Sequence, residues 1–177
     1  MLNGIISEST FTDMEIILMQ YNIEDIFTKY RDSIFAIGFN YFRNSFDADD
    51  IVQTTFYKLS RSSNEFDSEE HIRNWLIRVA ANECKSISLS PWKSRRENID
   101  DYVQNLAVTD PDQGALFEEV MKMKKKYRQV LHLFYYEGYK TKEIADILNI
   151  SESAARTRLS RARELLKNRL GEAWQNE

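Results

Sequence analysis

The sequence predicts an all-α protein of two small helical domains joined by a flexible linker, and the C-terminal domain is expected to be a helix-turn-helix. The chain of 177 residues contains only five glycines and two prolines, so few positions oppose helix formation. Apolar residues recur at steps of three and four, which places them on one face of each helix. No alternation typical of a β-strand persists for more than a few residues.

Three helices are predicted in the N-terminal domain, which we place at residues 24–88 after an extension at residues 1–23. Asp47 fits the N-cap or the first turn of the second helix, where a carboxylate complements the helix dipole. The third helix follows a polar loop and has Asp67 or Ser68 as its expected cap. The expected helices span residues 24–43, 47–60 and 69–88.

A linker is predicted at residues 89–112, because the helical periodicity lapses there and prolines and acidic residues accumulate. The helical pattern then continues to about Leu170 within a C-terminal domain that we place at residues 113–177. Gly138 is expected to interrupt this pattern. The aromatic residues 134–136 are predicted to lie in the core of this domain.

The net charge of −4 hides separate blocks of opposite charge. Residues 71–99 carry six basic and two acidic side chains, and residues 122–177 carry thirteen basic and seven acidic ones. Residues 1–70 carry five basic and thirteen acidic side chains, and residues 100–121 carry six acidic and no basic ones. Basic blocks suit nucleic-acid phosphates, whereas acidic blocks suit a basic protein partner or intramolecular masking.

Several classes of protein are disfavoured by the sequence. Cys84 is the only cysteine, so it forms no internal disulfide, and no zinc-ligand spacing surrounds it. The N-terminus lacks the pattern of a signal peptide, and no stretch approaches about 18 uninterrupted apolar residues. We therefore expect a cytoplasmic protein that is not embedded in a membrane, holds no metal and uses no cofactor or small-molecule substrate.

The most informative segment, residues 141–163, carries the pattern of a helix-turn-helix. Thr141 is expected to cap a short first helix without a capping box, because Ile144 would then occupy the third helical position. Asn149 fits the turn, where a left-handed backbone is needed, and Ser151 fits the cap of the second helix. Hydroxyl and guanidinium groups on this helix suit base edges and phosphates in a major groove. The predicted exposed face carries Ser153, Arg156, Thr157, Ser160 and Arg161.

A second motif, at residues 47–56, places three carboxylates at the start of the second helix. These carboxylates could in principle form a catalytic pair or a metal site. No histidine lies nearby, however, and adjacent helix positions do not converge on one point. The polar stripe of Asp50, Gln53 and Thr54 is more typical of a docking face, so we predict that the protein is not an enzyme.

These two motifs resemble a known family. DADDIVQTTFYKL followed by EEHIRNWLIRVAAN resembles the second conserved region of extracytoplasmic-function (ECF) sigma factors, within the sigma-70 family. YRQVLHLFYYEGYKTKEIADILNISESAARTRLSRARELLK resembles their fourth region, and together the resemblance covers roughly residues 24–88 and 113–170. It implies a sigma factor that binds core RNA polymerase and directs promoter-specific transcription initiation by reading the −10 and −35 elements. Residues 123–126 depart from the family, because they lack the proline-containing start of the fourth-region helix.

The resemblance also implies roles for individual residues and a further partner, an anti-sigma factor. The residues implied for polymerase binding are Asp47, Asp50 and Gln53. Those expected to bind −10 DNA are Asn64, Phe66, Arg78, Asn82 and Lys85, the two cations being included because they surround Asn82 on one helix. Those expected to bind −35 promoter DNA are Ser153, Arg156, Thr157, Arg158, Ser160 and Arg161.

Two functions from other classes stay open on the residues alone. A stand-alone helix-turn-helix transcription regulator would bind duplex DNA without polymerase, usually as a dimer. An enzyme with an appended DNA-binding domain, such as a nuclease, would need converging carboxylates or a nucleophile–base pair, and the sequence offers neither. Co-purification with core RNA polymerase would distinguish a sigma factor from both.

Overall fold

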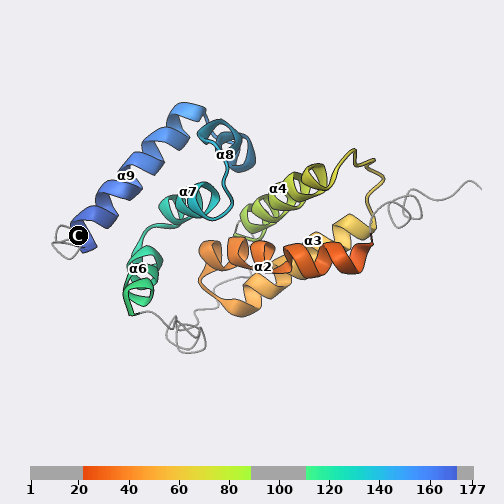
Figure 1. Cartoon of the computed structure of the whole chain (residues 1–177), viewed down its shortest axis with the longest axis horizontal. Helices are drawn as coiled ribbons and strands as arrows, with labels where there is room; N and C mark the ends of the chain where they lie inside the picture. The colour runs from red at the N-terminus through yellow and green to blue at the C-terminus, as the bar shows by residue number, and fades with distance from the viewer. Residues whose placement is uncertain (1–21, 89–110, 171–177) are drawn as a thin grey trace, which may run out of the picture.

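The computed structural model describes residues 22–88 and 111–170, and within these ranges the chain forms seven α-helices and no β-strand (Figure 1). Helices α2 to α4 form an N-terminal unit, and helices α6 to α9 form a C-terminal unit. Most of the predicted linker and of the N-terminal extension lies outside the described residues. The helices are α2 (Ile23–Phe42), α3 (Ser45–Ser60), α4 (Glu69–Ser88), α6 (Pro111–Lys122), α7 (Lys125–Tyr135), α8 (Thr141–Leu148) and α9 (Glu152–Leu170).

Side-chain caps fix where α3 and α4 begin. The Asn44 side chain accepts a hydrogen bond from the Asp47 amide at 2.9 Å, which makes Asn44 the N-cap of α3. Asp47 therefore lies in the first turn of the helix, which was one of its two predicted positions. The Ser68 hydroxyl accepts a hydrogen bond from the His71 amide at 3.1 Å, so Ser68 caps α4 as predicted.

The three N-terminal helices pack around fully buried aliphatic side chains, among them Ile34, Ile51 and Leu76. Helices α2 and α3 approach so closely that a Cβ atom on Gly38 would lie 2.9 Å from the Ala48 Cα atom. Only glycine fits at this crossing without a backbone shift. The packing uses one face of α3 and leaves its opposite face to solvent.

The C-terminal unit begins at Pro111, slightly before the predicted helical start. Proline suits the first helical position because its missing N–H would have no partner there. The prediction that Thr141 caps α8 was wrong, because Lys140 is the N-cap and its side chain makes no capping hydrogen bond. The helix begins at Thr141 and is preceded by Lys140, so Glu143 rather than Ile144 takes the third position, and its carboxylate accepts a hydrogen bond from the Lys140 amide at 2.7 Å.

The turn between α8 and α9 has the predicted geometry. Asn149 adopts the left-handed conformation with φ 50° and ψ 57°. The Ser151 hydroxyl accepts a hydrogen bond from the Ala154 amide at 3.2 Å, which confirms Ser151 as the cap of α9. Ala155 and Leu159 are buried, so the inward face of α9 is the one that the sequence predicted.

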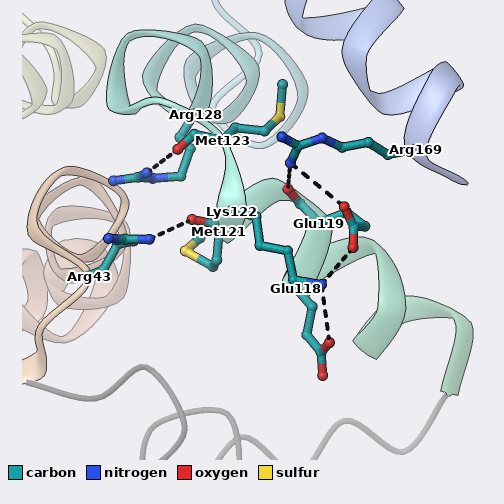
Figure 2. Close-up of polar contacts among 8 residues, drawn as sticks. All are labelled: Arg43, Glu118, Glu119, Met121, Lys122, Met123, Arg128 and Arg169. Atoms are coloured by element: carbon teal, nitrogen blue, oxygen red, sulfur yellow. Dashed lines mark hydrogen bonds and ion pairs between the residues drawn. The ribbon is translucent and has the colours of Figure 1, made fainter.

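Two arginines join the end of α2 to the junction between α6 and α7 (Figure 2). Arg43 donates a hydrogen bond to the Met121 carbonyl at 3.2 Å, and Arg128 donates one to the Met123 carbonyl at 2.5 Å. Carbonyls at helix ends have no amide partner within the helix, so a cation there satisfies them and complements the helix dipole. Arg128 also donates to the carbonyls of Asn40 at 2.7 Å and Tyr41 at 3.2 Å, in the last turn of α2.

Arg128 is a buried cation, only 3% exposed. Burial, and to a smaller extent the nearby Arg43, lowers the pKa of its guanidinium to about 10, so it stays protonated at neutral pH. The start of α7 lacks the proline that the resemblance would lead us to expect there, and it has Lys124 at its N-cap with no side-chain hydrogen bond. The arginine contacts hold this junction in place of a local cap.

The two units pack on each other, with α7 against α2 and α8 against α4, and their buried apolar residues form one continuous core (Figure 1). The prediction that residues 134–136 are all core was wrong. Tyr135 is 58% exposed and Tyr136 is 78% exposed, and only Phe134 is half-buried. The packed face of α7 runs instead through Val130 and Leu133.

Candidate nucleic-acid interface

Helix α9 presents a polar face to solvent. Five of the six residues predicted to bind −35 DNA are exposed there: Ser153, Arg156, Thr157, Ser160 and Arg161. The Thr157 hydroxyl donates to the Ser153 carbonyl at 2.8 Å, and Arg156 lies 3.7 Å from the Glu152 carboxylate. An exposed ion pair of this kind contributes little, so the Arg156 guanidinium can exchange it for a phosphate or a base.

Arg158 differs from the other five residues predicted to bind −35 DNA. It is half-buried and lies near Lys85 of α4, which is also half-buried. Burial and then the charge of Arg158 lower the pKa of the Lys85 ammonium. The Lys85 ammonium donates to the Leu148 carbonyl at 2.5 Å, at the end of α8. Lys85, which was predicted to bind −10 DNA, and Arg158, which was predicted to bind −35 DNA, therefore both lie at the contact between the two units.

The residues predicted to bind −10 DNA occupy two kinds of position. Arg78 and Asn82 are exposed one turn apart on α4, and Asn64 is exposed in the preceding loop. Phe66 is only 4% exposed, and its ring packs edge-on against Trp75 with the centroids 5.8 Å apart. The structure thus places Phe66 in the core beneath the loop, and the half-buried Trp75 packs against the same core.

The exposed face of α3 carries two aromatic residues that the sequence reading missed. Phe46 and Tyr57 are each 65% exposed, and Asp50 and Gln53 lie exposed between them. Steps of four, three and four residues place these four side chains on one stripe of the helix. Asp47, also predicted at the polymerase surface, is only 8% exposed because its position falls on the buried side with residues 51 and 55.

A further apolar groove of about 880 Å³ lies among α2, α6, α7 and α9. Phe117, Leu131 and Leu166 are among its lining residues, and the exposed Tyr135 and Tyr136 also line it. Arg163 contributes to the lining, donates to the Tyr135 hydroxyl at 2.8 Å and lies over the Phe134 ring. Such a groove with an aromatic lining suits an apolar partner surface.

Within residues 22–88 and 111–170, no three histidine, cysteine or acidic side chains come together as a metal site would require. In the same part of the chain, no helix combines the length and apolar character needed to cross a membrane. Cys84 is fully buried, and burial raises the pKa of its thiol to about 12. Because the thiolate is the reactive form, this cysteine is a packing residue.

Two family models match the chain, "Sigma-70 region 2" over residues 26–88 and "Sigma-70, region 4" over residues 113–166. The ECF RNA polymerase sigma factor SigW of Bacillus subtilis is 28% identical over 163 residues, covering 82% of this chain and 87% of the relative. The RNA polymerase sigma factor CarQ of Myxococcus xanthus is 25% identical, covering 84% and 89%. The crystallised sigma factor RpoE of Bartonella quintana, in complex with the anti-sigma factor NepR, has a similar fold, with a TM-score of 0.64 and 18% identity over 84% of this chain and 96% of that chain.

The helix-turn-helix and the second helical unit define a DNA-binding protein with two functional regions. The matches to both regions identify the class more narrowly. The chain belongs to the ECF group of the sigma-70 family, and it is a sigma factor that directs promoter-specific transcription initiation.

Proposed function

We propose that three exposed helix faces divide the work of this sigma factor. The α3 stripe binds core RNA polymerase, α4 and its preceding loop open and read the −10 element, and α9 reads the −35 element. The observation that carries this assignment is that each face is exposed on a different helix and has the side chains its partner requires. The α3 stripe is apolar and acidic, whereas the other two faces are basic and polar.

The α3 stripe has the composition of a protein interface. Phe46 and Tyr57 are large anchors that can each bury apolar surface in a partner's pocket. Asp50 and Gln53 between them supply a charge and an amide for hydrogen bonds to a basic partner surface. Asp47 is too buried to contact the partner directly and instead belongs to the buried side of the first turn of α3.

The face of α4 fits single-stranded DNA. Separating bases costs unstacking energy on the order of a few kcal/mol per step, which new contacts to the exposed bases and phosphates must offset. Arg78 can bind phosphate, and the exposed amides of Asn82 and Asn64 can bind the edge of an unpaired base. Phe66 supports this loop from below by packing against Trp75.

Run-off transcription with reconstituted holoenzyme across a promoter library tests the assignment. Asp50→Lys should lower core binding at least tenfold, because charge reversal at a complementary interface costs several kcal/mol. Asn82→Ala should keep core binding but reduce promoter opening, visible as fewer permanganate-reactive thymines. Asp25→Lys, an exposed charge reversal on α2, is the matched control. Duplex binding without any effect on transcription would instead favour a stand-alone regulator.

An anti-sigma factor is the further partner that we assign to this chain. Its support is the family and the complexes in which related sigma factors have been solved. The apolar groove among α2, α6, α7 and α9 is where we place this partner, with Tyr135 and Tyr136 as anchors. Replacing both tyrosines by alanine should weaken the complex at least tenfold while transcription with core polymerase persists. A complex of unchanged affinity would contradict this placement.

The remaining assignments follow from this role. A sigma factor works by binding and positioning, so we assign the chain no catalytic step, cofactor or small-molecule substrate of its own. It acts where RNA polymerase acts, which places it in the cytoplasm. Purified protein should therefore show no nuclease activity on promoter DNA with or without divalent metal, and cleavage lost in an Asp50→Asn variant would contradict this.

A further inference from the structure

The apolar groove among α2, α6, α7 and α9 is lined along one side by a continuous stripe of α9. The leucines of this stripe are half-buried, and so are Leu116 and Phe117 of α6, which also line the groove. Apolar side chains that line a groove in this way suit a covering segment. The residues of the stripe follow one another at steps of one to four positions and fall on one side of the helix: Arg163, Leu166, Lys167 and Leu170.

The end of α9 is held at this groove (Figure 2). Arg169, in the last turn of the helix, donates to the Glu119 carbonyl at 3.4 Å and lies 3.7 Å from the Glu119 carboxylate. The same carboxylate accepts a hydrogen bond from Lys122 at 2.7 Å, so polar contacts join α9 to the last turns of α6. Leu170, the last residue of α9, lines the groove. The chain therefore leaves α9 at the groove.

The residues that follow α9 in the sequence, 171–177, lie outside the described residues and are named here the tail. Gly171 comes directly after the helix, at the position where glycine commonly lets the backbone turn in the left-handed conformation. Trp174 is the one large apolar residue of the tail, and tryptophan is a residue type that anchors well in apolar pockets. The sequence of the tail thus combines a turn signal with an apolar anchor.

The charges of the tail and of the groove are complementary. The tail contains two acidic residues, Glu172 and Glu177, and no basic ones. Arg163 and Lys167 are the cations among the lining residues of the groove, and Glu164 is the one carboxylate there. An acidic segment with an apolar anchor therefore fits this groove better than a basic segment would.

The tail is long enough to reach the groove. Four residues separate Leu170 from Trp174, and an extended chain of that length spans at most about 14 Å. Leu166 lies about 6 Å and Arg163 about 10 Å back along α9, at a rise of 1.5 Å per residue. A chain that reverses at Gly171 can therefore place the indole ring over Leu166 and beside the Arg163 guanidinium, which already lies 4.9 Å from the centre of the Phe134 ring.

We propose that the tail folds back into this groove and that Trp174 covers its apolar lining. Because the tail is tethered beside the groove, its effective concentration there is on the order of millimolar, so even weak contacts fill the groove. A second copy of the chain would have to bind without this advantage. The proposed function places an anti-sigma factor in the same groove, and on that placement rests the regulatory consequence: the tail competes with this partner and lowers its apparent affinity by the fraction of chains whose groove is filled.

Nuclear Overhauser contacts in the full-length chain test the docking directly. The indole signals of Trp174, assigned by their loss in Trp174→Phe, should show contacts to the methyl groups of Leu116 and Leu166. Leu170 is too close in sequence to be diagnostic. The absence of these contacts would overturn the proposal. So would contacts from residues 1–21 to the same methyl groups in their place, or contacts that disappear on dilution, as a second copy would give.

Competition with a dye measures how far the tail fills the groove. Anilinonaphthalene sulfonate is apolar and anionic, so it suits a groove lined by Arg163 and Lys167. Trp174→Ala should raise the affinity for the dye at least fivefold, and a synthetic peptide of residues 170–177 should displace the dye from this variant. Gln175→Ala, which removes no apolar anchor from the same tail, is the matched control and should leave the affinity unchanged. An unchanged affinity in Trp174→Ala would overturn the proposal.

A further variant locates the dye. Tyr135 and Tyr136 are exposed and line the groove, so their replacement by alanine in the Trp174→Ala chain should remove most of the gain in affinity. A gain that persists would place the tail elsewhere and overturn the proposal. Neither measurement involves polymerase or an anti-sigma factor, so their failure would leave the proposed function standing. A docked tail in a chain that supports no promoter-dependent transcription would instead count against the proposed function alone.

Discussion

Individual side chains in this protein form hydrogen bonds with the backbone amides and carbonyls that have no partner at helix ends. Asn44, Ser68 and Ser151 each accept a hydrogen bond from an amide in the first turn of a helix. Arg128 satisfies helix-end carbonyls with a buried guanidinium, which lysine could not do because it lacks the planar fork of donors. The first kind of cap is local in sequence, whereas Arg128 also joins residues 87 and 88 positions apart.

The turn of the helix-turn-helix depends on a backbone conformation that few residues tolerate. Asn149 has φ 50°, so Asn149→Val should lower the free energy of unfolding by about 1–2 kcal/mol, because a branched side chain clashes in the left-handed region. Asn149→Gly should be close to neutral. Urea unfolding followed by circular dichroism measures both variants. An equal loss in both would mean that the asparagine side chain, and not the backbone, is what matters.

Residue-scale features of this kind were predictable to the extent that they are local. The left-handed Asn149 and the Ser151 cap follow from residue type and position, and the structure confirms both. The burial of Asp47 could also have been predicted from the sequence, because it lies four and eight residues before Ile51 and Thr55 and so on the same side of α3. The prediction placed Asp47 on the surface because it is charged, without regard to its position around the helix. It overlooked the exposed Phe46 for the same reason, because residue type was considered before helical position.

Helices are the scale at which the sequence was most informative. The third predicted helix has the bounds of α4, and the first two differ from α2 and α3 by one or two residues, because apolar spacing reports helical phase directly. The exposed face of α9 is also as predicted for five of its six residues. The aromatic residues 134–136 did not predict the core correctly, because hydrophobicity alone does not show which side of α7 packs against the protein.

The α3 stripe should owe its affinity for core polymerase mainly to its aromatic residues. Phe46→Ala and Tyr57→Ala should each weaken binding by about 2 kcal/mol or more, because truncating an aromatic anchor removes apolar area from the partner's pocket. Both side chains are exposed in the free chain, so the stability of the fold should change little. Binding titrations with fluorescent sigma factor and thermal unfolding give the two readouts. Phe56→Ala, a half-buried residue of the same helix, should show the opposite pattern.

Helix α9 should separate residues that read sequence from residues that only hold DNA. An arginine can pair with guanine through two hydrogen bonds, which is worth about 1–3 kcal/mol of discrimination. Arg156→Ala or Arg161→Ala should therefore relax the preference at one or two base pairs. Lys167→Ala, near the end of the helix, should weaken all sequences alike and lower the salt slope by about one.

Affinities for single-base variants of the promoter at two salt concentrations distinguish these outcomes. Lys142→Ala, an exposed cation on α8, is a control for loss of charge alone. Uniform weakening across all base variants in every arginine mutant would mean that α9 contributes only charge. Sequence preference at the −35 element would then have to come from the shape of the DNA.

At the scale of the whole molecule, the contacts between the two units were beyond sequence reasoning. Arg73 donates to the Glu137 carboxylate 64 residues away, and Arg128 donates to the Asn40 carbonyl 88 residues away, with the predicted linker between the partners. Neither helical phase nor capping preference constrains such pairs, which depend on how two finished units dock. A charge-block argument suggested intramolecular masking by acidic residues, but the acceptors in the described contacts between the units are mainly backbone carbonyls and neutral side chains, with the buried Glu137 carboxylate beside them.

That carboxylate makes the stability of the folded chain depend on pH in a defined direction. Burial by itself would raise the pKa of Glu137, but hydrogen bonding and charge from His132 and the charge of Arg73 hold it below the ordinary 4.5, so its contribution is fully present above pH 4.5 and is lost as the pH falls through the lowered value. At neutral pH, Glu137→Gln should lower the free energy of unfolding by about 3 kcal/mol, because it leaves the partly buried Arg73 without a negatively charged partner, although the backbone carbonyl at this position still accepts its hydrogen bond. The difference between the two chains should shrink as the pH falls below 4.5, since protonation removes the same charge from the unsubstituted chain. Urea unfolding at pH values from 7 to 3 measures this difference, with the exposed Glu118→Gln as the control. A difference that stays constant over this range would show that the loss comes from packing and not from the charge on Glu137.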